Sequence, residues 1–139
     1  MVSPLAKLHF SAPTDWLDVS VLAFTAGGGE GYAENIVASC EPLNGHNLVA
    51  FASEAIEDLK AMTADYRSIR REAASYAGIK GELVEHSFVE DGVALCQVQF
   101  FFAVDDDGFT LAVTYPADQV DVLHKTFEKV AASLSTSSA

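Results

Sequence analysis

The chain has few basic side chains and no long apolar run, and each shortage excludes a class of protein. Its 139 residues hold 8 Lys and Arg against 20 Asp and Glu, a formal net charge of −12. A field of that sign repels phosphate, which argues against a nucleic-acid or anionic-membrane partner. No stretch approaches the roughly 18 uncharged apolar residues of a membrane span, so no direct membrane insertion is expected.

Cysteine is also scarce, with only Cys40 and Cys96 present. The pair lacks the C-x-x-C spacing of zinc and redox sites, and each cysteine lies in an apolar, strand-like run. Because cysteine packs as a small hydrophobe, both are expected to be buried free thiols. The N-terminus has no apolar signal core, so the expected location is cytoplasmic, with periplasmic as the alternative if a signal was trimmed.

The chain is, in contrast, rich in apolar residues. Half of its residues are hydrophobic, including nine Phe. At this length the simplest organisation is one domain over 1–139, with 134–139 as a frayed tail. A chain of this size buries about 70% of its unfolded surface, so a metal or disulfide is not needed for folding.

The spacing of the apolar residues predicts the elements. Extended runs bounded by Gly and Pro predict strands over 8–12, 17–26 and 35–42. Apolar residues three and four apart predict amphipathic helices over 47–66 and 118–135, with four more strands between them. The order predicts an α+β fold, in which a single-domain antiparallel β-sheet of about six to seven strands is flanked by the two amphipathic helices.

The stretch QVQFFFAVDDDGFTLAVTYPA, residues 97–117, joins two of these strands. Its aspartates do not fit a calcium loop, because no glycine stands sixth and no glutamate twelfth, so no metal site is expected. Asp-Gly between alternating strands instead predicts a hairpin with Asp107 and Gly108 at its centre. A second Asp-Gly, Asp91 and Gly92, predicts the preceding hairpin.

The parity of this hairpin divides its residues between two faces of the sheet. One face receives Phe100 and Phe102 and is expected to be core. The other is uncharged and carries Gln97, Gln99, Phe101, Ala103, Thr110, Ala112 and Thr114. Two interpretations stay open: the chain covers this face itself, or the face is a groove for an apolar partner, with Gln, Ser and Thr supplying hydrogen bonds.

No other pattern indicates catalysis. The glycine loop at 27–31 lacks the Lys-Ser/Thr of a phosphate loop, and the four histidines match no metal or catalytic spacing. We therefore expect no catalytic residue, no cofactor and no enzymatic activity. Trp16 is the only tryptophan; it is expected to pack over a sheet edge, with a partner-facing anchor as the alternative.

Several stretches resemble one family. HFSAPTDWLDVSVLAF, YAGIKGELVEHSF and CQVQFFFAVDDDGFTLAVTYPA, followed by the closing amphipathic helix, are similar in order to the DcrB-like proteins. The resemblance implies a PsbP-like fold. Within the family, WLDVSVL is similar to the Eag-type effector chaperones of type VI secretion. That likeness implies a cytoplasmic dimer that shields apolar, transmembrane-like segments of a secreted effector.

Together these observations favour a non-enzymatic binding protein that holds apolar segments of a secretion effector on its sheet face, with a homodimer as the expected assembly. The candidate partner-binding residues are Gln97, Gln99, Phe101, Thr114 and Trp16. Two alternatives stay open. One is a small-ligand or enzymatic domain with a pocket between sheet and helices, and the other is an envelope-associated DcrB-like protein lacking its export signal.

Overall fold

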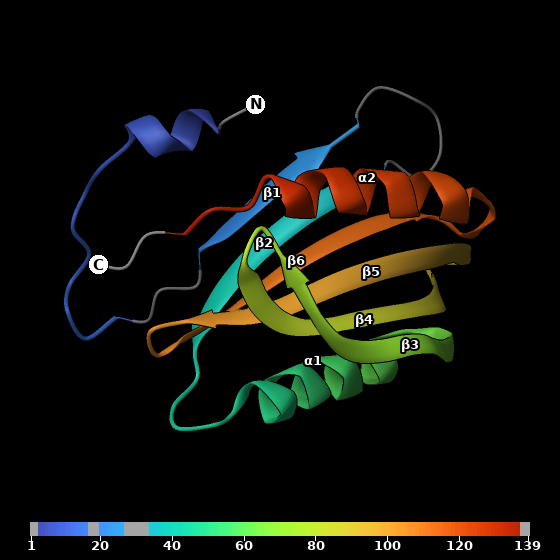
Figure 1. Ribbon diagram of the computed structural model, residues 1–139, viewed down its shortest axis with the longest axis horizontal. Coiled ribbons are helices and arrows are strands. Elements are labelled where there is room, and N and C mark those ends of the chain that lie inside the picture. The colour runs from blue at the N-terminus through green and yellow to red at the C-terminus, as the bar shows by residue number, and fades with distance from the viewer. Residues whose placement is uncertain (1–2, 17–19, 27–33, 137–139) are drawn as a thin grey trace.

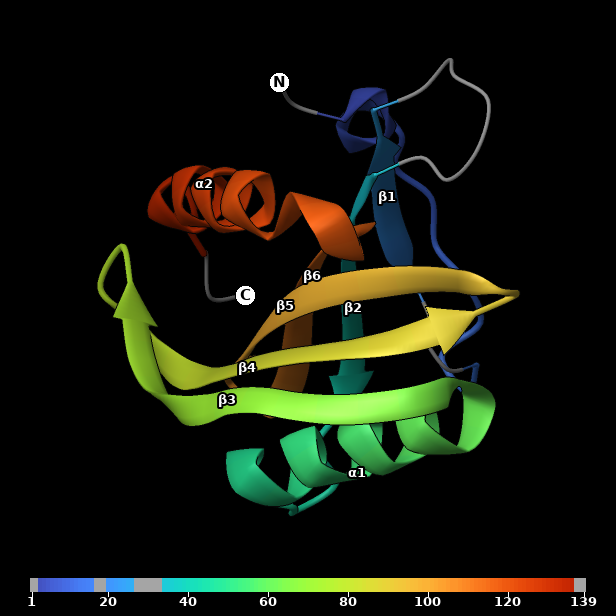
Figure 2. The same cartoon turned by 90° about the vertical axis from the view of Figure 1, so that its right-hand side faces the viewer.

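A computed structural model describes residues 3–16, 20–26 and 34–136. Six strands form one antiparallel sheet in the order β1-β2-β6-β5-β4-β3, with one helix on each face (Figures 1 and 2). This confirms the α+β fold class. The elements in chain order are the 3-10 turn η1 (Pro4–Lys7), β1 (Val21–Thr25), β2 (Asn35–Pro42), α1 (Leu48–Met62), β3 (Ala64–Tyr76), β4 (Ile79–Glu90), β5 (Val93–Val104), β6 (Asp107–Pro116), the 3-10 turn η2 (Ala117–Gln119) and α2 (Val120–Ala132).

The hairpin between β4 and β5 forms where Asp-Gly predicts it. Asp91 and Gly92 both take positive φ, 51° and 77°, and Glu90 pairs with Val93 across the turn. Two successive residues in the left-handed region match the twist of the flanking strands.

The hairpin between β5 and β6 turns two residues earlier than predicted. Val104 pairs with Asp107, and Asp105 takes the positive φ of 55°. Gly108 therefore lies within β6, where a Cβ would come within 2.9 Å of the side chains of Leu43 and Phe51. Gly108 is therefore not part of the turn; its lack of a side chain leaves room for Leu43 and Phe51. The shift is an even number of residues, so the predicted division of β5 and β6 between faces is unchanged.

The strand predicted over 8–12 is absent. All described residues from Pro4 to Trp16 are exposed and, after η1, none is in a helix or strand. Leu8 and Phe10 offer only two alternating apolar positions before Pro13, and here they meet neither a neighbouring strand nor a buried face. The next predicted strand, 17–26, forms only over β1, and residues 17–19 lie outside the described part of the chain.

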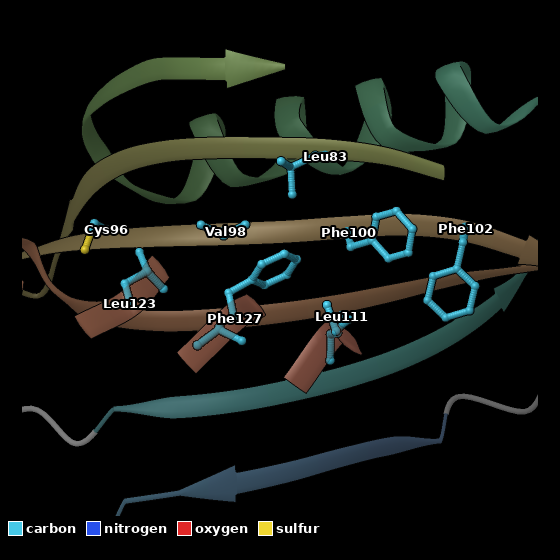
Figure 3. Close-up of a cluster of buried hydrophobic side chains, with 10 residues drawn as sticks. Leu83, Cys96, Val98, Phe100, Phe102, Leu111, Leu123 and Phe127 are labelled. Carbon is cyan, nitrogen blue, oxygen red and sulfur yellow. The ribbon is translucent and has the colours of Figure 1, made fainter. Parts of the chain in front are cut away.

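The larger core lies between the sheet and α2. Phe100 contacts the rings of Tyr76 and Phe102, with centroids 5.0 and 5.3 Å apart, and Tyr76 also meets Phe127 of α2 at 5.3 Å. Figure 3 shows Leu123 and Phe127 of α2 facing side chains of β4, β5 and β6. Its buried members are Leu83, Cys96, Val98, Phe100, Phe102, Leu111, Val113, Leu123, Phe127 and Ala131.

A smaller core lies under α1, on the opposite face. Asn47 caps the helix by accepting a hydrogen bond from the Ala50 N–H at 2.8 Å. The helix buries Phe51, Ala52 and Ile56 against Val84 and Phe101 of the sheet. Phe51 meets Phe101 edge-on at 5.9 Å, and Phe101 is 0% exposed. The sequence-based assignment of Phe101 to an open partner surface is thus corrected, because α1 covers it.

Candidate functional site

The face that carries α1 is only partly covered by it. The buried cluster beneath α1 takes its sheet residues from β4 and β5, and none of its described members comes from β1 or β2. Figure 2 shows the helix beside β3 and β4, at the end of the sheet away from β1. Beyond α1, no described helix covers the part of this face over β1, β2, β6 and β5, and we call it the open face, although Ala112 and Thr114 at its centre are only 7% and 4% exposed.

A row of uncharged polar residues crosses the open face at right angles to the strands. Each member stands directly opposite the next, one from each of five neighbouring strands. We call these residues the polar row: Thr25, Asn35, Thr114, Gln97 and His86. The row contains Gln97 and Thr114, which the sequence assigned to a binding face.

Side-chain hydrogen bonds link the polar row to β3. The hydroxyl of Tyr66 lies 2.9 Å from Nδ1 of His86, and Nε2 of His86 lies 2.7 Å from Oε1 of Gln97. The Gln97 amide donates in turn to Oγ1 of Thr114 at 2.9 Å. Because an amide oxygen can only accept, Nε2 of His86 carries the proton and Nδ1 accepts from Tyr66. The chain of donors thus runs in one direction, from Tyr66 to Thr114.

This arrangement holds His86 in its neutral form. Its side chain is 0% exposed, and burial lowers the pKa of the imidazole below the ordinary 6.5, although the Gln97 hydrogen bond and nearby Glu85 oppose the shift. Burial also raises the pKa of the Tyr66 hydroxyl, which keeps it a donor at neutral pH. The row is therefore polar without being charged.

A second row, of small and apolar residues, runs beside the first across the same strands. We call it the small row: Ala23, Val37, Ala112, Gln99 and Val84. Oε1 of Gln99 is buried and has no hydrogen-bond partner among the described residues. A buried amide oxygen without a donor costs about 1–3 kcal/mol, so this oxygen lowers the stability of the folded chain locally.

Charged side chains join the helices to the sheet on both faces. The Glu85 carboxylate is 4% exposed and lies 3.2 Å from a guanidinium nitrogen of Arg70 and 2.8 Å from Nε2 of His124. These contacts join α2 to β3 and β4. Arg71 similarly joins β3 to α1, donating to the Val49 carbonyl and to Ser53.

The structure brings three of the five predicted binding residues together. Gln97 and Thr114 are bonded within the polar row, and Gln99 is in the small row beside them. Phe101 shares the face but lies under α1. Trp16 is 71% exposed, and no hydrogen bond or ring contact joins it to a described residue of either row. Sequence reasoning missed His86, although its alternation with Val84 and Phe88 places it on this face.

Among the described residues, a groove of about 560 Å³ between Leu22, Phe24 and Leu134 is as large as a ligand pocket, but its lining is mainly apolar. A smaller cavity of about 160 Å³ lies on the α2 side of the sheet, and two of the hydroxyls that line it, Tyr115 and Thr126, bond each other at 2.8 Å. Ligand pockets are typically about 300–1,000 Å³. Within the described ranges, no three His, Cys, Asp or Glu side chains are grouped so as to bind a metal. In the same ranges, neither helix is long and apolar enough to cross a membrane.

Comparison with known folds places this architecture in a class. The solution structure of the cyanobacterial PsbP from Synechocystis sp. PCC 6803 superposes with a TM-score of 0.54 at 13% identity, over 81% of this chain and 79% of that one. An antiparallel sheet with a helix on each face is thus a PsbP-like α+β fold. The chain belongs to the DcrB family, whose model matches residues 8–133.

Two further solved structures share the fold. PA94 of Pseudomonas aeruginosa, a protein of unknown function, has a TM-score of 0.81 at 13% identity, over 100% of this chain and 98% of that one. LpqN of Mycobacterium tuberculosis, which is involved in cell envelope biogenesis, has a TM-score of 0.56 at 12% identity, over 83% and 79%. No curated protein matches the chain.

Proposed function

We propose that this protein is a non-enzymatic binding protein whose open face holds apolar, transmembrane-like helices of a secreted effector. The observation that carries the proposal is the pairing of the polar row with the small row. Beyond α1, the members of the two rows on β1, β2, β6 and β5 form an uncharged surface four strands wide, which we call the floor.

The chemistry of this floor suits an apolar helix better than a polar partner. Ala23, Val37 and Ala112 allow a helix backbone to approach closely, as small residues do where membrane helices pack. Gln97 and Gln99 are only half-buried, so their side chains can meet the polar groups of such a helix. The resemblance of WLDVSVL to Eag-type chaperones supports the same partner class.

The test uses a fluorescently labelled peptide of about 20 Leu and Ala residues, long enough for one membrane helix, with Lys at both ends. Anisotropy measures its binding to the full chain. We expect Val37→Lys to weaken binding at least about ten-fold, because a helix on the floor would have to bury that charge. Ala73→Lys is the matched control: it faces the same side from exposed β3, outside both rows, and should bind as the parent does.

Two results would overturn the proposal. One is absence of peptide binding by the parent chain, which would favour the small-ligand or envelope-associated alternatives. The other is a Val37→Lys variant that remains folded by circular dichroism and binds the peptide as tightly as Ala73→Lys does.

A further inference from the structure

His86 lies at one end of the polar row, where the open face meets the strands that carry α1. Its side chain is 0% exposed. Two aromatic rings meet the imidazole edge-on, that of Tyr66 with centroids 5.2 Å apart and that of Phe88 at 5.7 Å. Its two ring nitrogens are bonded to Tyr66 and Gln97. Because solvent does not reach this ring, a positive charge on it would depend on the surrounding groups for stabilisation.

The strands on either side of Gln97 and His86 supply little of that stabilisation. Glu85, next to His86 on β4, points to the other face, where it meets Arg70 and His124. Its effect on the pKa of the imidazole is smaller than that of burial. β5 has no charged residue. The charged residues of β4 that share the face of His86 are four or more positions away: Lys80, Glu82 and Glu90.

The groups that approach from β3 and α1 supply no counter-charge either. Tyr66 presents a hydroxyl, whose pKa is raised by burial. Lys60 of α1 lies over the Tyr66 ring, 5.2 Å from its centroid, and pairs with Glu57 at 3.1 Å. Arg71, further along β3, bonds the backbone of α1. The hydrogen bonds of the imidazole thus go to a hydroxyl and an amide, and these do not neutralise a charge.

We infer that His86 makes binding at the open face depend on pH: the face accepts an apolar helix while the imidazole is neutral and rejects it once the imidazole is protonated. The inference rests on the proposed function and adds a means of regulation to it. Histidine is suited to this role because its charge changes within the range from pH 5 to pH 8.

The hydrogen bonds fix where the proton is bound. Nε2 of His86 already carries a proton and donates it to Gln97, so a second proton from solvent can be bound only at Nδ1. The Tyr66 hydroxyl, which donates to Nδ1 in the neutral form, must then turn to accept from it. The bond from Nε2 to Gln97 remains, and Gln97 in turn bonds Thr114 at the centre of the floor. The polar row then ends in a buried cation.

A helix on the floor makes that cation more costly. The helix replaces the water above Gln97 and Thr114 by apolar atoms, so a charge at His86 loses the distant solvation that it has in the free chain. The complex therefore binds the proton more weakly than the free chain does, and the pKa of His86, already below 6.5, falls further. By linkage, affinity is constant above both pKa values and decreases as the pH falls below that of the free chain.

The first test measures anisotropy of the same labelled Leu and Ala peptide with the full chain from pH 7.5 down to pH 5. Circular dichroism checks that the chain is folded at each pH. We expect the Kd to rise in the acid range by up to about ten-fold per pH unit. His86→Gln can still donate to Gln97 but cannot be charged, so its ratio of Kd at pH 5 to Kd at pH 7.5 should be near one.

His46→Gln is the matched control. It makes the same substitution at an exposed histidine before α1, so its Kd ratio should equal that of the parent. A parent ratio no larger than that of His86→Gln overturns the inference.

The second test uses the parent chain alone and needs no variant to fold. Ring chemical shifts measured by NMR should show the proton of neutral His86 on Nε2, and the pKa of this ring should be lower with saturating peptide than without it. A pKa that the peptide leaves unchanged, or a neutral ring with its proton on Nδ1, overturns the inference.

The peptide assay separates this inference from the proposed function. Absence of binding at pH 7.5 refutes the proposed function and the regulation with it. Binding at pH 7.5 that persists unchanged to pH 5 supports the function and refutes only the role of His86.

Discussion

The two faces of the sheet show how one set of strands supports both a core and a surface. The α2 face is apolar where helix and sheet meet, with the rings of Tyr76 and Phe102 against Phe100. The α1 face has a short apolar contact around Phe101 and then two uncharged rows of which, among the described residues, α1 covers only Val84. Stability is concentrated on the first face, and the groups suited to a partner are concentrated on the second.

The largest expected effect tests the claim about stability. Phe100→Ala should lower the free energy of unfolding by about 3–5 kcal/mol, because it empties a fully buried site. Phe101→Ala should cost less, since Phe101 has one ring contact, with Phe51, where Phe100 has two. Urea unfolding measures both, with the 80% exposed Phe10→Ala as the control. Equal losses at the two buried positions would show that the α1 face is as tightly packed as the other.

An intermediate effect is expected where α1 approaches the sheet. Gly108→Ala places a Cβ within 2.9 Å of Leu43 and Phe51, so these side chains must shift, at about 1–3 kcal/mol. The control is a double-mutant cycle with Phe51→Leu, whose smaller side chain leaves room for the methyl group. We expect the two changes together to cost less than their sum. Additive losses would mean that the helix does not limit residue 108.

The smallest effect concerns pH. Because the pKa of His86 is lowered in the folded chain, unfolded chains bind more protons below about pH 6.5, and stability falls as the pH drops through that value. The urea midpoint should decrease between about pH 7.5 and about pH 5.5. His86→Gln should flatten this dependence, while His124→Gln, on the α2 face, should leave the fall in place. Coinciding profiles for the parent and His86→Gln would exclude His86 as its source.

The faces themselves could be predicted from the sequence, because strand parity depends only on local alternation. Phe100 and Phe101 point to opposite sides even though the turn lies two residues from its predicted place. The role of Gly108 could not be predicted, since Asp-Gly is a turn signal and the contact that requires glycine comes from Leu43 and Phe51, far upstream. The packing of α1 on Phe101 could not be predicted either, because the pattern of an amphipathic helix does not indicate which face of a sheet the helix packs against.

The strand predicted around Leu8 failed for a related reason. Alternation shows that a segment can be extended, but only a neighbouring strand makes it part of a sheet. The predicted binding residues Gln97, Gln99 and Thr114 are close together because their strands are neighbours. The hydrogen bond between His86 and Gln97 requires the β4–β5 register that the Asp91-Gly92 turn sets, but the sequence pattern does not show which side-chain atoms then meet.

The sheet order has a consequence for how the chain folds. Strands β3 to β6 are joined by successive hairpins, so each can pair with a neighbour made just before it. β2, in contrast, pairs with β6, so Asn35 pairs with Thr114, which is far away in the sequence. Such long-range pairing is slow because a large loop has to close first. During synthesis β1 and β2 therefore leave the ribosome long before β6, with which β2 pairs. We expect the β1–β2 hairpin to join the sheet last.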